Sequence, residues 1–346
     1  MVKIQIKYGF TSFICIFVLK YVFMETLDNI KKPISREFEE FAALFKESVS
    51  SDDGLLGQVL EYVGARHGKM LRPILMLLSG RLCGRVGEKT YHSAIALELL
   101  HTASLVHDDV VDESDRRRGS RSVNDIFDNK VAVLGGDYIL GTSLLHASFS
   151  GDIEVVRLIA RLGQALSHGE IVQLESISSE EFSEEKYYKI IRNKTAVLFS
   201  SSSAIGAICA GSDRQIIDRM FAFGEKLGMA FQIKDDIFDY YSNDIGKPTG
   251  NDMREGKLTL PSLYVLNNVA GEEQRATALK IRRQEATDEE IHKFVEYVKS
   301  EGGIEYAEER MKEIRDEAMD MLPSDASPEL VRALRAYIDF VVERKI

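Results

Sequence analysis

The sequence predicts an all-α fold in which most of the chain forms helices packed into one large bundle. Only six prolines occur, and residues 74–247 contain none. Because proline interrupts helix interiors and central strands alike, this gap permits long elements of either kind. Periodicity decides for helices: strand-like alternation is rare, and in 152–177 apolar residues recur three or four apart, at Ile153, Val156, Ile159, Leu162, Leu166 and near Val172.

Neither a repeat nor a linker rich in Gly, Ser or Pro divides the chain. With 346 residues, 45% of them hydrophobic, it can bury a large core, and we expect residues 24–346 to form a single domain. Thr287 and Glu290 have the spacing of a capping box and predict a helix start. We expect short loops at 50–54, 116–122 and 149–152, and a longer loop, long enough to be functional, at 242–257.

The N-terminal residues 1–23 have a basic start and an apolar run from Phe10 to Leu19, which resembles the first two regions of a signal peptide. No small-residue cleavage site follows, and the run is shorter than the roughly 20 apolar residues that span a bilayer. We therefore expect Met24 to be the native start and residues 1–23 to be a non-native or dispensable extension.

The formal net charge of −11 argues against nonspecific binding of nucleic acid. It also means that an anionic substrate would need a metal ion or a local cluster of bases. The cysteines, Cys15, Cys83 and Cys209, lie far apart with no CxxC spacing, so the sequence suggests neither a disulfide framework nor a zinc site. A reducing cytoplasm is the location that fits best.

Two copies of the acidic pattern DDxxD each follow an apolar stretch. In the first copy, Asp108 and Asp112 stand four residues apart with Asp109 between them, so on a helix the two carboxylates point the same way and repel. A single run of this kind is more often a solvated face laced with ion pairs. The second copy favours two carboxylate clusters that face each other across a bundle, and it consists of Asp235, Asp236 and Asp239.

Carboxylate oxygens are hard ligands that suit Mg²⁺, or Mn²⁺ in its place, better than zinc or copper. Magnesium keeps coordination positions open for water and phosphate oxygens, so two facing clusters would grip a diphosphate through bridging ions. This arrangement would let an acidic protein bind an anion.

Basic residues near the acids are candidate phosphate ligands. The first arginines follow the first DDxxD, and Gly119 is expected to end their helix as a C-cap. Each base taken singly is more often a solvated surface residue. Together they could hold two diphosphates, one through metal and the other by Lys and Arg alone. They are Arg117 and Arg118, Lys69 and Arg72 on one helical face, Lys194 beside Thr195 at a helix start, and Lys247 with Lys257.

These motifs together resemble the trans-isoprenyl diphosphate synthases, also called polyprenyl synthetases, from about Ile30 to the C-terminus. The matching stretches, in the family's order and spacing, are "GKMLRP", "LLHTASLVHDDVVDESDRRRG", "AVLGGDYIL", "GEIVQ", "NKTA", "FQIKDDIFDY" and "GKPTGNDMREGKLTLP". One departure is that His67 and Gly68 replace the usual glycine pair before Lys69, so we expect the local loop shape to differ there.

The resemblance implies an all-α bundle around a deep central cavity, usually in a homodimer, and it implies a role for each matching residue. Asp108, Asp112 and Asp235 would coordinate Mg²⁺ on the allylic diphosphate, with Asp109, Asp236 and Asp239 completing the motifs. The same diphosphate would contact Arg117, Lys194 and Lys247. Isopentenyl diphosphate would be held without metal by Lys69, Arg72, His101 and Arg118. Close to the chemistry would lie Thr195, Gln232 and Lys257.

The implied reaction is electrophilic alkylation. The allylic C–O bond ionises, the isopentenyl double bond attacks the allylic cation, a proton is lost, and the chain grows by one unit. In the family, aromatic residues four and five positions before the first aspartate stop growth early. Ala103 and Ser104 stand there and are small. We therefore expect a hexaprenyl to decaprenyl product, octaprenyl above all, for quinone side chains, with transient membrane contact for its release.

Leu145 and Phe149 are candidates for the cavity floor, although ordinary core positions are the commoner reading of such a pair. The alternatives are a short-chain farnesyl or geranylgeranyl diphosphate synthase, a terpene cyclase, a catalytically silent partner subunit and a di-iron carboxylate bundle. The silent subunit would have lost acidic ligands, and a cyclase would not need Lys69, Arg72 and a second DDxxD. The di-iron reading rests on the two ExxH patterns Glu98–His101 and Glu289–His292, the second of which is expected to face solvent.

Overall fold

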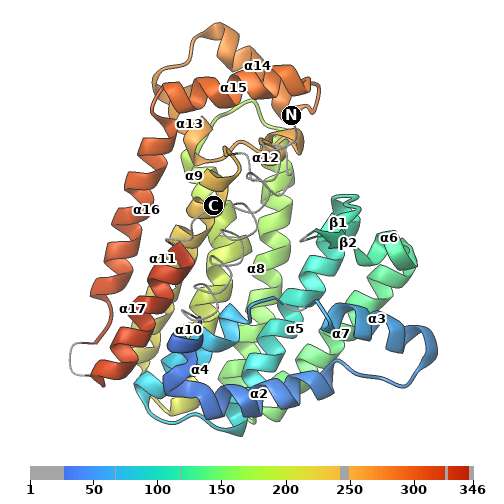
Figure 1. The fold of residues 1–346 in the computed structure, drawn as a ribbon, viewed down its shortest axis with the longest axis vertical. Coiled ribbons are helices and arrows are strands. Elements are labelled where there is room, and N and C mark those ends of the chain that lie inside the picture. The colour runs from blue at the N-terminus through green and yellow to red at the C-terminus, as the bar shows by residue number, and fades with distance from the viewer. Residues whose placement is uncertain (1–26, 67, 118, 242–248, 324–325, 343–346) are drawn as a thin grey trace, which may run out of the picture.

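The computed structural model describes residues 27–66, 68–117, 119–241, 249–323 and 326–342. Helices dominate these ranges, so the predicted all-α class is confirmed. Within the described residues the β structure is confined to a two-stranded antiparallel hairpin of β1 (Arg116–Arg117) and β2 (Ser120–Arg121). Figure 1 shows the long helices standing roughly parallel, with shorter helices at both ends of the bundle.

Six helices build the body of the bundle: α4 (Leu71–Cys83), α5 (Glu88–Val111), α7 (Asn129–Phe149), α8 (Ile153–Ile177), α10 (Val197–Ala210) and α11 (Arg214–Phe238). The α10 helix is buried almost all round, although it carries four consecutive serines. Ser202 and Ser203 donate hydrogen bonds to carbonyls four residues earlier in their own helix. Because these hydroxyl groups are satisfied locally, a polar helix can occupy the core.

Glycines let α10 approach its neighbours closely. A Cβ atom at Gly206 would lie 2.5 Å from the carbonyl oxygen of Met76 in α4. One at Gly224 in α11 would lie 2.4 Å from that of Phe199 in α10. No side chain fits at these distances, so the absence of a Cβ sets the helix spacing.

The remaining elements surround this body. At the end of the bundle drawn uppermost in Figure 1, α14 and α15 lie across the long helices, and α2 crosses the opposite end. These elements are η1 (Lys32–Ile34), α2 (Ser35–Ser48), α3 (Gly54–Gly64), α6 (Val123–Phe127), α9 (Glu184–Ile191), the π-helical turn η2 (Arg192–Ala196), α12 (Asn251–Arg254), α13 (Leu260–Asn268), α14 (Glu272–Arg282), α15 (Asp288–Ser300), α16 (Gly303–Asp320) and α17 (Pro328–Val342).

Several predicted boundaries are confirmed. The helix expected over 152–177 is α8, and the loop before it separates it from α7. Thr287 and Glu290 form the predicted capping box at the start of α15. Ile153 was expected on the apolar stripe of α8 but is exposed, because it lies in the first turn, before the helix packs on its neighbours.

Three local predictions are wrong. The helix that carries Asp108 already ends at Val111, and Gly119 lies in the hairpin turn with φ +78° rather than capping a helix. Lys69 precedes α4 and Met70 has the left-handed φ of 53°, so Lys69 and Arg72 do not share a helical face. The segment 242–257, expected to be all loop, contains α12, while its residues 242–248 lie outside the described ranges.

None of the helices that the structure describes is both long and apolar enough to cross a membrane. The apolar run Phe10–Leu19 and Cys15 lie outside the described residues. Cys83 and Cys209 are free thiols.

Candidate active site

A cavity of 1380 Å³ lies among α5, α8, α9, α10 and α11. The carboxylates of Asp108 and Asp112, at the C-terminal end of α5, line it together with Asp235, near the C-terminal end of α11. The two acidic motifs therefore meet in one cavity, as their repetition predicted. A helix C-terminus carries partial negative charge, so both motifs place carboxylates where the helix dipole disfavours additional negative charge.

The middle residue of the first motif plays a different part. Asp109 is 3% exposed, does not line the cavity, and accepts a hydrogen bond at 2.6 Å from Arg117 Nε. Burial raises the pKa of Asp109, although Arg117 opposes the shift. Burial likewise raises the pKa of Asp108 to about 6. Asp109, which was expected to complete the motif, thus anchors Arg117 in the structure.

The aspartates of the second motif also differ in their contacts. Asp239 accepts the backbone N–H groups of Asn251 and Asp252 at 3.0 Å each, so it caps the start of α12 and does not line the cavity. Asp236 lines the cavity but is 4% exposed. Burial raises the pKa of Asp236 to about 7.

A chain of hydrogen bonds leads to Asp236 from three elements. The hydroxyl of Thr195 donates to Gln232 Oε1 at 2.7 Å, and the amide of Gln232 donates to Asp236 Oδ1 at 2.8 Å. Tyr187, on α9, donates to the other carboxylate oxygen at 2.6 Å. The structure therefore gives Thr195 and Gln232, whose roles were open, a shared task of orienting Asp236. Tyr187 was not predicted, because nothing in its local sequence links it to a residue 49 positions away.

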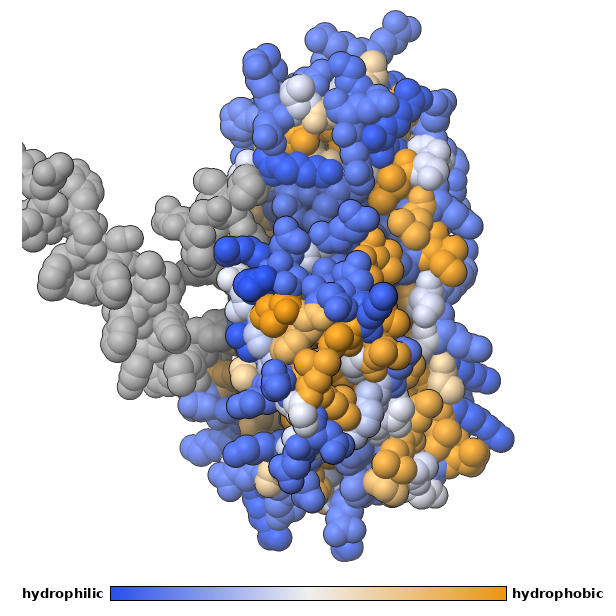
Figure 2. Space-filling model, turned by 90° about the vertical axis from the view of Figure 1, so that its right-hand side faces the viewer, coloured by the Kyte–Doolittle hydropathy of each residue, from blue (hydrophilic) through white to orange (hydrophobic). Residues whose placement is uncertain are grey.

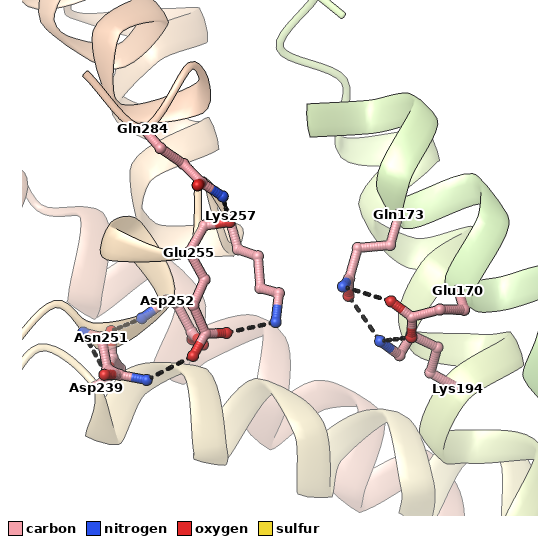
Figure 3. A network of polar contacts seen from close by, with 9 residues as sticks. All are labelled: Glu170, Gln173, Lys194, Asp239, Asn251, Asp252, Glu255, Lys257 and Gln284. Atoms are coloured by element: carbon pink, nitrogen blue, oxygen red, sulfur yellow. Dashed lines mark hydrogen bonds and ion pairs between the residues drawn. The ribbon is translucent and has the colours of Figure 1, made fainter. Parts of the chain in front are cut away.

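Two lysines face each other across the cavity (Figure 3). On one side Lys194 forms an ion pair with Glu170 and donates to Gln173 Oε1 at 3.0 Å. On the other side Lys257 Nζ lies 2.5 Å from Glu255 Oε2. Burial by itself would lower the pKa of Lys257, but the pair with Glu255 outweighs burial, and the pKa is raised. The side chains of both lysines line the cavity.

The residues that hold these lysines, and a carboxylate beside them, were missed as site residues. Glu170 and Gln173 belong to "GEIVQ", which was matched without a role, and Asp252 and Glu255 belong to "GNDMREGK". All four line the cavity. Burial, with the charges of Asp239 and Asp236, raises the pKa of Asp252 well above its ordinary value.

Of the bases expected around the second diphosphate, Arg72 and His101 line the cavity. Arg117, which was expected at the allylic diphosphate, lines the cavity from the hairpin. The guanidinium of Arg72 lies over the ring of Phe199, 5.6 Å from its centroid. Lys69 is exposed, does not line the cavity, and has its Nζ atom 5.7 Å from the ring centroid of Phe340. Three positions lie outside the described residues: Arg118, Lys247 and His67, which stands where the family usually has a glycine.

Ala103 and Ser104 both line the cavity, as predicted for residues that gate product length. Leu145 and Phe149 do not: their side chains are 52% and 54% exposed on the outer face of α7. The floor assignment is therefore wrong, because α7 turns a different residue, Leu140, toward the cavity.

The second ExxH pattern faces solvent, as expected. Glu289 pairs with Lys293 on the surface of α15, and His292 is exposed. Glu98 and His101 are buried in α5. Across the described residues, no three His, Cys, Asp or Glu side chains are grouped so as to hold a metal ion by themselves. The oxygen donors that line the cavity nevertheless fit a hard divalent ion that also binds substrate oxygens.

An all-helical bundle whose cavity combines two acidic motifs with opposed lysines defines a class of synthases that act on diphosphate esters. The family model described as "Polyprenyl synthetase" matches residues 53–298. The chain belongs to the polyprenyl synthetase family. Membership of this family implies a requirement for a divalent metal ion.

Named relatives differ in product. The chain is 32% identical to an octaprenyl diphosphate synthase of Haemophilus influenzae over 92% of this chain and 97% of the relative. Among solved structures, a geranylgeranyl pyrophosphate synthase from Bacteroides thetaiotaomicron is 44% identical with a TM-score of 0.81, covering 92% of this chain and all of that one. A decaprenyl diphosphate synthase from Rhodobacter capsulatus is 33% identical with a TM-score of 0.84, covering 92% and 98%.

The buried hydrogen bond from Tyr187 yields a prediction for the metal-free protein. A carboxyl group whose folded-state pKa is raised contributes stability at low pH that is lost as the pH rises through that pKa. Tyr187→Phe removes a donor from the Asp236 carboxylate and so raises its pKa further. We expect urea unfolding to show a loss of about 1 kcal/mol near pH 5 and about 2–3 kcal/mol near pH 8.5.

Tyr306→Phe is the matched control, since Tyr306 donates to Glu184 at 3.0 Å outside the cavity. An equal loss at both pH values in Tyr187→Phe would contradict the assignment of this hydrogen bond to the charged form of Asp236.

Proposed function

We propose that the protein is a trans-polyprenyl diphosphate synthase that adds isopentenyl diphosphate successively to an allylic diphosphate. The observation that carries this function is the meeting of Asp108, Asp112 and Asp235 with Lys194 and Lys257 in one cavity. Relatives of the chain are named as octaprenyl and decaprenyl diphosphate synthases, which supports a long-chain all-trans product.

For the allylic diphosphate, Asp108, Asp112 and Asp235 would hold Mg²⁺ ions, with Mn²⁺ as a substitute. The bound ions would supply Lewis-acid stabilisation of the departing diphosphate. Lys194, Arg117 and Lys247 would contact the same group. Because Lys194 is already held by Glu170 and Gln173, its charge is positioned before the allylic C–O bond ionises, which is where preorganised charge accelerates a reaction.

Isopentenyl diphosphate would be held without metal by Arg72, His101, Lys69 and Arg118. Arg72 lies in the first turn of α4, whose N-terminal N–H groups add partial positive charge there. His101, in α5, approaches the same cavity from the other side of the interface between α4 and α5. The second substrate would thus be bound by bases alone, separate from the carboxylates.

The reaction also needs an apolar surface beside the allylic cation that excludes water. The cavity has many apolar lining residues, among them Leu100, Leu166, Leu198 and Phe231. Such a surface excludes water that would otherwise capture the cation. The growing tail can occupy the same space, because its carbon skeleton is apolar throughout.

Product length is proposed to be octaprenyl, within a range from hexaprenyl to decaprenyl, on the strength of the small gating residues Ala103 and Ser104. The alternative is a short-chain synthase, and the similarity to a solved geranylgeranyl pyrophosphate synthase supports that alternative. Quinone side chains are the proposed end use, and residues 24–346 the proposed single domain, in the cytoplasm. Release of so apolar a product would involve transient contact with a membrane.

A homodimer is proposed from the outer face of α7. Large apolar side chains lie exposed there at helical spacing, namely Leu134, Tyr138, Leu145 and Phe149. Figure 2 views the molecule from the side of α3, α6 and α7 and shows apolar side chains gathered on that face. An isologous pair of copies would cover such a stripe, since a C₂ interface uses the same patch twice.

The metal and diphosphate sites should reinforce each other. Mg²⁺ relieves the repulsion among the carboxylates, and the diphosphate completes the coordination of the ion. Each ligand alone should add about 2.7 kcal/mol to the free energy of unfolding when it is present at a hundred times its Kd. With both ligands bound, we expect the unfolding temperature to rise by more than the sum of the two separate shifts.

Asp108→Ala and Asp235→Ala should abolish this synergy and lower activity on the order of 10²-fold or more. Asp316→Ala, on the exposed surface of α16, is the control and should change neither quantity. Additive shifts in the wild-type protein would contradict the shared site.

Ala103→Phe should shorten the product, because an aromatic ring would fill the cavity five residues before Asp108. Reverse-phase chromatography of dephosphorylated products gives the chain lengths. Ala160→Phe, at an exposed position of α8 outside the cavity, is the matched control and should leave the length unchanged. An unaltered product from Ala103→Phe would rule out this gate.

Leu145→Glu should convert the dimer to monomers, because it places a charge in an apolar contact. Light scattering after size-exclusion chromatography measures the mass. Ile216→Glu, at an apolar position of α11 that is 40% exposed, serves as the control and should leave the dimer intact. A dimeric Leu145→Glu variant would place the interface elsewhere.

A further inference from the structure

The part of the cavity away from the carboxylates is bounded by α5 and α8. On α5, Leu100 precedes Asp108 by eight residues, which is roughly 12 Å along the helix axis. On α8, Gly163 precedes Glu170 by seven residues, or roughly 10 Å, and Glu170 holds Lys194 beside the carboxylates. Both Leu100 and Gly163 line the cavity. They therefore mark a level about two helical turns deeper than the reacting groups.

The two residues face each other. A Cβ atom built at Gly163 would meet one heavy atom outside its own helix within 4 Å, the Cδ1 of Leu100 at 3.6 Å. This is an ordinary van der Waals distance, so a side chain at Gly163 would start without a clash and extend toward the space beside Leu100.

The presence of glycine at position 163 requires a physical explanation. Gly163 lies in the interior of the 25-residue helix α8, where glycine is less stable than alanine. Close packing explains Gly206 and Gly224, whose added Cβ atoms would collide with backbone oxygens. It does not explain Gly163, because a Cβ atom there meets no backbone atom within 4 Å. What the missing side chain leaves is open volume within the cavity.

We propose that Gly163 is a specificity-determining residue that keeps the passage between α5 and α8 open to the growing prenyl tail. The inference rests on the proposed function, since it concerns the length of the product. The ligand at this level is an apolar, methyl-branched hydrocarbon, and apolar residues surround the passage, namely Leu100, Leu140 and Leu166. A larger side chain at position 163 would close the passage beside Leu100 and end elongation there.

This gate is distinct from the one at Ala103. Ala103 is three residues closer to Asp108 than Leu100 is, which is about 4.5 Å along α5. A block at Ala103 would therefore stop the chain earlier than a block at Gly163. The two gates should act in order, with the one nearer the carboxylates dominant.

The test is a product-length series with farnesyl diphosphate, excess isopentenyl diphosphate and Mg²⁺. Gly163→Leu should give products shorter than the wild type by one or more isoprene units. The double variant Ala103→Phe/Gly163→Leu should give the product of Ala103→Phe alone. Ala160→Leu adds the same side chain to the exposed face of α8 and should leave the product length unchanged.

Gly163→Ala controls for folding: its unfolding temperature should not fall, because the added Cβ has room and alanine favours the helix. If Gly163→Leu is unstable, Gly163→Val is judged by the same product series. Wild-type product length in a folded Gly163→Leu or Gly163→Val variant overturns the proposal, as does a slower first addition without shortening. Failure of the wild-type protein to elongate the primer at all would refute the proposed function instead, and that result involves no variant.

Discussion

Negative charge at the C-terminal ends of α5 and α11 is the constraint on which the rest of the site depends. Each motif adds carboxylates at a helix C-terminus, which already carries partial negative charge, and burial raises the pKa of Asp108, Asp109 and Asp236. Such an arrangement is unfavourable in the absence of cations. The fold tolerates it by dividing each motif between ligand-facing and structural positions.

That division organises the surrounding elements. Asp109 forms an ion pair with Arg117 and so fixes the hairpin of β1 and β2, while Asp239 accepts backbone N–H groups at the start of α12. Asp236 is held by donors from α9 and α11, and Gln232 links it to Thr195 in the π-helical turn. Asp108, Asp112 and Asp235, which line the cavity, are thus presented by a scaffold that the other aspartates of the same motifs stabilise.

The sequence allowed the helical class and most of the cavity residues to be predicted, because periodicity and repeated motifs are local signals. It could not separate Asp109 from Asp108, since the direction of a side chain depends on how the helix is rotated in the bundle. Tyr187 and Glu170 act through partners distant in the sequence, which no local pattern reveals. Leu145 and Phe149 were misplaced because α7 is apolar on more than one face, and spacing does not tell which face meets the cavity and which lies exposed.

The π-helical turn at Arg192–Ala196 has a consequence for the length of this segment. Its wider turn contains more residues than an α-helical turn, and it lies between α9, which carries Tyr187, and α10, which carries Leu198. Deleting one residue would either close this turn to ordinary α-helical winding or, with the wide turn kept, rotate α9 against α10 by roughly 100°, and in both cases Lys194 and Thr195 would change direction. Natural homologues should therefore vary here by substitution and rarely by insertion or deletion, so that alignments through this stretch stay free of gaps.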